Sequence, residues 1–154
     1  MISNDLVLLL PLYLANAALL PVMRRRLLGN LHGIDAPVCE RAFGKSRTWL
    51  GLAFILVSVT LCYALLLGRV CVLPALGMIA GVHAASLLKR CLGMKDSSPF
   101  PPVDQLDFFV GGVFGLALCG VYLSEPLVMA VITFFIHLFS NMIAYKAGLK
   151  DVWW

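Results

Sequence analysis

The sequence predicts an all-α, polytopic membrane protein with five transmembrane helices, an N-terminus outside the cell and a cytoplasmic C-terminus. Hydrophobic residues make up 61% of the 154-residue chain and charged residues 13%, whereas soluble domains contain roughly 45 to 50% apolar and about 25% charged residues. The mean hydropathy of +0.94 agrees with this contrast. Most apolar residues fall into five runs, each near the roughly 17 to 25 residues that cross a bilayer as a helix; these runs are 6–22, 49–67, 70–88, 108–123 and 127–144. We therefore expect residues 1–154 to form a single integral membrane domain.

The first run has the flanking charges of a span that stays in the chain. No basic residue precedes it and three arginines at 24–26 follow it, which is the reverse of a cleavable secretory signal. With the N-terminus outside, the cytoplasmic parts are loops at about 24–47 and 89–104 and the C-terminal tail. These parts hold 11 of the 12 basic residues and leave Arg69 outside. This distribution follows the positive-inside rule, so we predict a multi-pass protein of the cytoplasmic (inner) membrane.

The net charge of +4 is explained by this topology and by attraction to anionic lipid headgroups. Basic and aromatic residues are not interleaved as they are on nucleic-acid-binding surfaces. We therefore expect the membrane as a partner and no nucleic acid.

The cysteines give no sign of a cross-linked framework. Their number is odd and none of them forms a C-x-x-C pair, so we predict neither a metal site nor a disulfide framework. We expect them to pack as small apolar residues, although Cys91, next to Arg90, is also a candidate for a modifiable thiol.

The first span and the loop after it contain polar residues that have either a structural role or a role in binding substrate. Asn16 lies among alanines, which is typical of a helix-to-helix contact; direct contact with a substrate is the alternative. The basic residues of the loop 24–47 either set topology alone or hold a lipid phosphate or nucleotide. The turn Gly44–Thr48 is basic and bears hydroxyl groups, but it is not a phosphate loop, because that motif requires glycine where Cys39 stands.

The third and fourth spans each contain a pair of glycines four residues apart. Gly77 and Gly81 form one pair, and Gly111 and Gly115 form the other. Small residues at this spacing let helix backbones approach closely, so we expect tight packing of both spans.

Between these spans, the stretch from Ser86 to Asp107 gathers most of the chemically capable side chains. On a helix, Ser86 shares one face with Lys89 and Arg90. Asp104 and Asp107 follow two prolines, which places them in the first turn of the next helix. The cations suit phosphate and the paired carboxylates suit a hard metal ion. Helix capping and compensation of the helix dipole are the alternative role of the aspartates.

In the last span, four polar side chains share one helix face. They are His137, Ser140, Asn141 and Tyr145. Such a stripe lines a cavity or forms hydrogen bonds between helices. With one histidine and no carboxylate, this face alone is not expected to bind a metal.

The central stretch resembles the signature of CTP-dependent phosphatidate cytidylyltransferases, S-x-x-[apolar]-K-R-x4-K-D followed by D-x-x-D. The matching residues, with the apolar place shifted by one to Leu88, are Ser86, Lys89, Arg90, Lys95, Asp96, Asp104 and Asp107. The short chain is most similar to CDP-archaeol synthases and their bacterial relatives. Leu10–Ala17 is similar to that family's opening motif, Gly44–Gly51 to its G-K-x-K-T-W-R-G motif, and His137–Lys150 to its final helix.

The resemblance implies a five-helix membrane enzyme in which a lipid phosphate attacks the α-phosphate of CTP. Mg²⁺ takes part, pyrophosphate leaves, and the product is a CDP-activated lipid of glycerol or polyprenyl type. Asp104 and Asp107 would bind the metal and act in catalysis together with Lys89. The residues expected to bind substrate are Ser86, Arg90, Lys95, Lys45, Thr48, Asn16 and Asn141.

Two positions depart from the family pattern. Val82 stands where the family motif G-D-x-x-x-S has a carboxylate assigned to the metal, and Leu50 stands where arginine is usual. His83 lies about 100° round the helix from position 82 and substitutes poorly for that carboxylate. The alternative function is therefore a weakened or inactive paralogue that binds a lipid or a membrane partner through the same fold.

Overall fold

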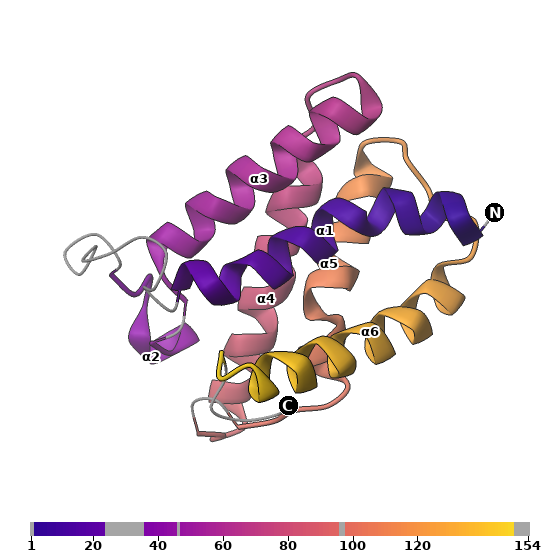
Figure 1. The fold of residues 1–154 in the computed structure, drawn as a ribbon. Coiled ribbons are helices and arrows are strands. Elements are labelled where there is room, and N and C mark those ends of the chain that lie inside the picture. The colour runs from indigo at the N-terminus through magenta and orange to yellow at the C-terminus, as the bar shows by residue number, and fades with distance from the viewer. Residues whose placement is uncertain (1, 24–35, 46, 96–97, 150–154) are drawn as a thin grey trace.

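The computed structural model describes residues 2–23, 36–45, 47–95 and 98–149. Within these residues the prediction of an all-α chain is confirmed, and one isolated β-bridge joins Pro37 to Thr48. Figure 1 shows α4 and α5 side by side, with α1 crossing them between α3 and α6. The described helices are α1 (Ile2–Met23), α2 (Glu40–Phe43), α3 (Trp49–Leu67), α4 (Leu73–Cys91), α5 (Val103–Leu118) and α6 (Pro126–Lys146).

Three of these helices, α1, α3 and α6, are long and apolar enough to cross a membrane. Helix α3 coincides with the expected run 49–67, and the short α2 was not predicted. Large apolar side chains on the outside of the bundle remain exposed, including Val57, Leu65, Phe114 and Leu127. Such a surface is stable against lipid tails and unfavourable in water.

Helix α5 differs from the expected run 108–123 at both ends. It begins at Val103 and ends at Leu118. Gly120, with φ of 74°, closes it: its N–H donates to the carbonyl of Ala117, and the N–H of Val121 donates to that of Leu116. Asp104 lies in the first turn as predicted. The same prediction was wrong for Asp107, which lies one turn further along because the helix starts at Val103.

Helices α4 and α5 touch through their backbones, as the glycine spacing predicted. A Cβ atom on Gly77 would clash with the carbonyl of Gly111, and one on Gly81 would clash with the carbonyl of Asp107. The two helices are antiparallel, so the end of α4 and the start of α5 lie together. Their close approach holds Ser86 and Lys89 opposite the aspartates.

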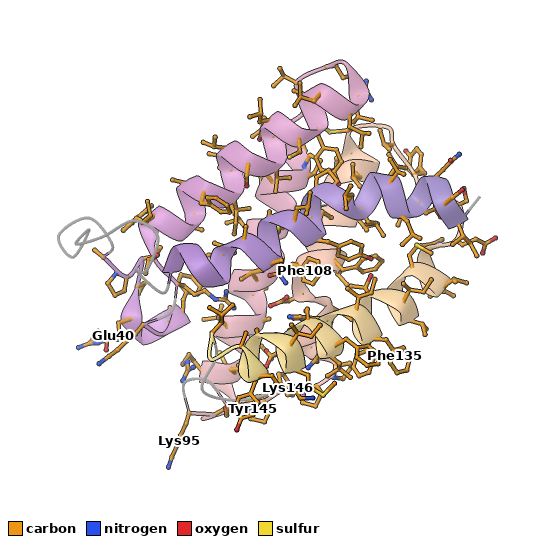
Figure 2. The ribbon with its side chains drawn as sticks, viewed as in Figure 1. Glu40, Lys95, Phe108, Phe135, Tyr145 and Lys146 are labelled. Atoms are coloured by element: carbon orange, nitrogen blue, oxygen red, sulfur yellow. A yellow bond between two sulfur atoms is a disulfide. The ribbon has the colours of Figure 1, made fainter. Side chains whose placement is uncertain are left out.

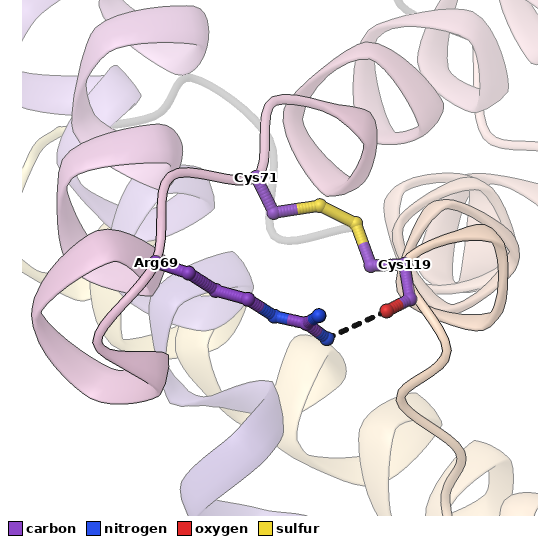
Figure 3. The surroundings of a disulfide bond; sticks show 3 residues. All are labelled: Arg69, Cys71 and Cys119. Carbon is purple, nitrogen blue, oxygen red and sulfur yellow. Dashed lines mark hydrogen bonds between the residues drawn. A yellow bond between two sulfur atoms is a disulfide. The ribbon is translucent and has the colours of Figure 1, made fainter.

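The opposite end of this helix pair is cross-linked. Cys71 and Cys119 form a disulfide, and the Arg69 guanidinium donates a hydrogen bond of 2.7 Å to the carbonyl of Cys119 (Figure 3). The prediction that the cysteines form no disulfide and pack as small apolar residues was therefore wrong for these two. Their positions are 48 residues apart in sequence, and only the antiparallel pairing of α4 with α5 brings them together.

At the same end, Asp5 of α1 caps α6. Its carboxylate accepts hydrogen bonds from the backbone N–H groups of Ser124 (3.0 Å) and Glu125 (2.9 Å). Helix α6 begins at Pro126 and its N-cap residue makes no side-chain cap, and Asp5 binds the N–H groups of the two residues that precede the helix. This contact fixes α6 against α1.

Candidate functional site

The centre of the candidate site is an ion pair between α4 and α5. Lys89 Nζ lies 2.7 Å from Asp104 Oδ2 and also donates to the carbonyl of Ser98 at 2.9 Å. The N–H of Phe100 donates to the same carboxylate oxygen at 3.0 Å. The Lys89 side chain is 13% exposed and that of Asp104 is 27% exposed. The pair therefore ties the loop between the helices to both of them and fixes the position of a partly buried cation.

Arg47 joins this site from the segment before α3. Its Nε donates to Ser86 Oγ at 3.0 Å, and Ser86 Oγ donates to the carbonyl of Val82 at 2.9 Å. Arg47 was not singled out as a site residue, and it was predicted only as one of the basic residues of the loop 24–47 that either set topology or hold a phosphate. Its signal in the sequence is its place in the Gly44–Gly51 motif, where it matches the second lysine.

The backbone around Arg47 is held firmly. Its carbonyl accepts the N–H of Val38 at 2.8 Å, and Trp49 N–H donates to the carbonyl of Ala36 at 3.1 Å. Thr48 is the N-cap of α3, and its hydroxyl oxygen accepts the N–H of Gly51 at 3.2 Å. These bonds place the guanidinium of Arg47 over α4, while the Thr48 hydroxyl is engaged in capping.

Asp107 lies just before the apolar run that begins at Phe108. Its side chain is partly buried, and the positive charges of Arg47 and Lys89 act on its carboxyl group. Its Oδ1 accepts a hydrogen bond of 2.6 Å from the N–H of Phe108. The carboxylate thus retains acceptor capacity next to cationic groups, and a bound cation would favour its ionised form.

The donor set fits a magnesium ion that keeps most of its ligands from water or substrate. No group of three or more His, Cys, Asp or Glu side chains converges among the described residues. Within the part of the chain that the structure describes, Asp104 and Asp107 are the two carboxylates at the site. Mg²⁺ is commonly bound by one or two carboxylates together with waters and substrate phosphates, so two are sufficient. The side chain at position 82 is valine, 4% exposed, and adds no oxygen.

Other predicted residues lie further from this centre. Lys45 is exposed and pairs with Glu40 at 3.4 Å, and Lys95 projects from the bundle (Figure 2). Arg90 donates to the carbonyl of Met94 at 2.8 Å, which shapes the loop after α4. Asp96 lies outside the described residues. The substrate-binding roles of these residues stay predictions.

His83 does not occupy the place of the missing carboxylate. Its Nδ1 lies 2.8 Å from the carbonyl of Ile79, and its ring meets that of Phe43 edge-on with centroids 4.6 Å apart. The side chain therefore faces α2. The two predicted amides belong to other helices: Asn16 is half-buried in α1 and Asn141 is buried in α6.

Residues 52–154 match the family model described as CarS-like, CDP-archaeol synthase. The CDP-archaeol synthases of Thermofilum pendens and Methanococcus aeolicus are 33% and 32% identical; the alignments cover 99% and 100% of this chain and 81% and 97% of those proteins. That of Methanocaldococcus jannaschii is 40% identical over 52% of this chain and 46% of its own length. A solved structure described as an intramembrane enzyme for archaeal membrane lipid biosynthesis is 28% identical, with a TM-score of 0.70 over 92% of this chain and 94% of that one.

Proposed function

The chain belongs to the CDP-archaeol synthase family, and we propose that it is a CTP-dependent cytidylyltransferase that converts a lipid phosphate into a CDP-activated lipid. The observation that carries this proposal is the joining of three segments at one end of the α4–α5 pair. Arg47 donates a hydrogen bond to Ser86, and Lys89 donates one to Asp104. The Asp107 carboxylate, which can accept further hydrogen bonds, lies near the charges of Arg47 and Lys89. This set of cations and carboxylates is suited to a triphosphate and its metal ion.

In the proposed reaction, an oxygen of the lipid phosphate attacks the α-phosphorus of CTP. The bond from that phosphorus to the bridging oxygen of the β-phosphate breaks, and pyrophosphate leaves with the electron pair. Catalysis of such a transfer consists mainly of positioning the groups and neutralising their charge. Lys89 and Arg47 are held by hydrogen bonds before substrate arrives, so they need little reorganisation to bind phosphate oxygens.

Asp104 and Asp107 are the residues that would hold Mg²⁺. When bound, the ion would neutralise charge on the phosphate oxygens of CTP. The other predicted substrate contacts, Arg90, Lys95 and Lys45, lie on the same end of the molecule, where they would add positive potential for two phosphorylated substrates. We assign the lipid phosphate to the glycerol or polyprenyl class.

The second candidate function is a paralogue that binds lipid or a membrane partner without catalysis. It is favoured by Val82, whose buried side chain replaces a carboxylate of the family motif. Purified protein with CTP, Mg²⁺ and a panel of lipid phosphates distinguishes the two. An enzyme is expected to release pyrophosphate, and a chelator of Mg²⁺ should abolish this release. A folded protein that releases none with any member of the panel would support the paralogue.

We further propose five spans, with α4 and α5 crossing the membrane in addition to the three apolar helices. The candidate site then faces the cytoplasm, where CTP is present. The disulfide supports this orientation, since it lies at the opposite end of α4 and α5 and disulfides persist in oxidising compartments. Arg69, the basic residue left outside by the charge pattern, lies beside that disulfide.

Reporter fusions test this orientation. Fusions after Lys45, Gly93 and Trp154 are expected to report a cytoplasmic position, because basic loops are retained inside. A fusion after Gly68, beside the disulfide-linked loop, is the matched control and should report the outside. An external signal from the Gly93 fusion would contradict both the topology and the placement of the site.

A further inference from the structure

Gln105 carries a buried amide that the proposed chemistry does not yet use. Gln105 follows Asp104 in the first turn of α5, and only 3% of its surface is exposed. Its side-chain oxygen is fully buried, and no described residue donates a hydrogen bond to it. Turning the amide over would place a buried nitrogen at the same point and leave a donor unpaired instead. Buried polar groups without a partner destabilise a fold, so the amide needs a reason to be there.

Gln105 lies on a different side of α5 from the residue that contacts Lys89. Asp104 contacts Lys89 of α4, and position 105 lies about 100° further round α5. It shares a helix face with Phe109 and Gly112, and a Cβ atom on Gly112 would clash with the side chain of Leu12 in α1. Gln105 therefore lies on the side of α5 that packs toward α1.

The neighbouring ring contacts extend this side of α5 to α6. Phe108 lies edge-on to Tyr13 of α1, with centroids 6.1 Å apart, and to His137 of α6, at 5.6 Å. Figure 2 shows Phe108 between these two helices. One helical turn closer to the candidate site lie Gln105 on α5 and the buried Asn141 on α6. The two amides thus occupy the same level of the bundle.

We propose that Gln105 binds an uncharged N–H or O–H donor of a bound substrate, on the α1 side of α5. This inference rests on the proposed function. The same face of α5 continues with apolar groups, Phe109 one turn on and Leu12 opposite Gly112 two turns on, and these disfavour a charged group there. In this arrangement the phosphates of the substrate bind the cations on the α4 side of α5. An uncharged part of the same substrate lies on the α1 side. Two substrates contain such a donor: CTP in its cytosine amino and ribose hydroxyl groups, and a lipid phosphate with a free hydroxyl.

Gln105→Met tests the proposal because methionine has nearly the same length and no hydrogen-bonding group. The KM for one substrate should rise roughly two- to tenfold, the effect of one lost hydrogen bond to a neutral group. The Tm without substrate should stay equal or rise, because an unpaired buried amide has been removed. Titration of CTP at saturating lipid, and of lipid at saturating CTP, identifies which substrate makes the contact.

Thr133→Val is the matched control. Thr133 is a buried polar residue whose hydroxyl is already bonded, to Tyr13 at 2.7 Å and to the carbonyl of Met129 at 2.6 Å. Its replacement should lower the Tm and leave both KM values unchanged. The same pattern in Gln105→Met, or unchanged KM values at any Tm, would show that the amide is structural and overturn the inference.

The outcome can be separated from that of the proposed function. If the unmodified protein releases no pyrophosphate, the enzyme proposal fails, and the inference is decided by the rise in Tm that CTP or a lipid phosphate causes. A smaller rise in Gln105→Met than in the unmodified protein supports the contact. An equal rise in both proteins, or no rise in either, refutes it.

Discussion

Replacing Asp107 by asparagine is expected to reduce pyrophosphate release from CTP by about 100-fold or more, the scale seen when a group that stabilises charge during the reaction is removed. Asparagine keeps the shape of the side chain and loses the negative charge that would bind Mg²⁺. The effect should appear in kcat and in the concentration of Mg²⁺ required. Assays over a range of Mg²⁺ concentrations measure both.

The stability of the same variant separates chemistry from folding. Asparagine removes a partly buried negative charge and keeps the shape of the side chain, so the Tm of Asp107→Asn without Mg²⁺ should be equal to or higher than that of the unmodified protein. A variant that loses activity at an unchanged or higher Tm has lost a chemical group and has kept its fold.

Glu125→Gln is the control for Asp107→Asn. It makes the same acid-to-amide change at the other end of the bundle, beside the Asp5 cap. Its activity is expected to match that of the unmodified protein. If Asp107→Asn retained full activity with normal dependence on Mg²⁺, the carboxylate would not be a metal ligand, and its role would be limited to the hydrogen bond that it accepts from the N–H of Phe108.

The sequence predicted the features that depend on neighbouring residues. The apolar runs located the long helices, and the bounds of α3 were correct to the residue. The glycine pairs predicted the backbone contact of α4 with α5. Ser86 and Lys89 were placed on one face of α4 because helix periodicity is a local property.

What the sequence did not predict depends on contacts between distant segments. Asp5 caps a helix 120 residues away in sequence, and Cys71 meets Cys119 across an antiparallel pair. Neither pairing leaves a spacing signal, because both follow from tertiary packing. Arg47 was missed for the same reason: its contact with Ser86 joins residues 39 positions apart. Sequence motifs therefore located parts of the site, and packing determined which parts meet.

The rigid contact between α4 and α5 also bears on position 82. Val82 lies one turn before Ser86 on α4, and its carbonyl accepts the Ser86 hydroxyl, to which Arg47 donates. An acidic side chain at this position would be buried within the bundle, one turn from the hydrogen bond between Arg47 and Ser86. The backbone contact leaves little freedom to bring another ligand into that place.

Val82→Asp is therefore expected to raise Mg²⁺-dependent pyrophosphate release, because it adds an oxygen ligand. The expected gain is about 10- to 100-fold, the size of the loss in other metal sites when a residue that supports a ligand is removed. Without metal the variant should be less stable, since a carboxylate within a span costs roughly 2.5 to 3.5 kcal/mol unless a cation offsets it. Mg²⁺ with CTP should restore the Tm, because the metal neutralises that charge. Activity and Tm measured with and without Mg²⁺ test both expectations.

Val82→Asn distinguishes charge from shape. It introduces a polar side chain of the same size without the negative charge, so it should lose stability, gain no activity, and show no added rise in Tm with Mg²⁺. A gain specific to Val82→Asp would mean that valine limits a site that is otherwise assembled for catalysis. If both variants stay at the activity of the unmodified protein and neither responds to Mg²⁺, position 82 does not face the metal. The family's ligand arrangement would then not apply to this chain, and Asp104 and Asp107 would have to form its metal site without help from α4.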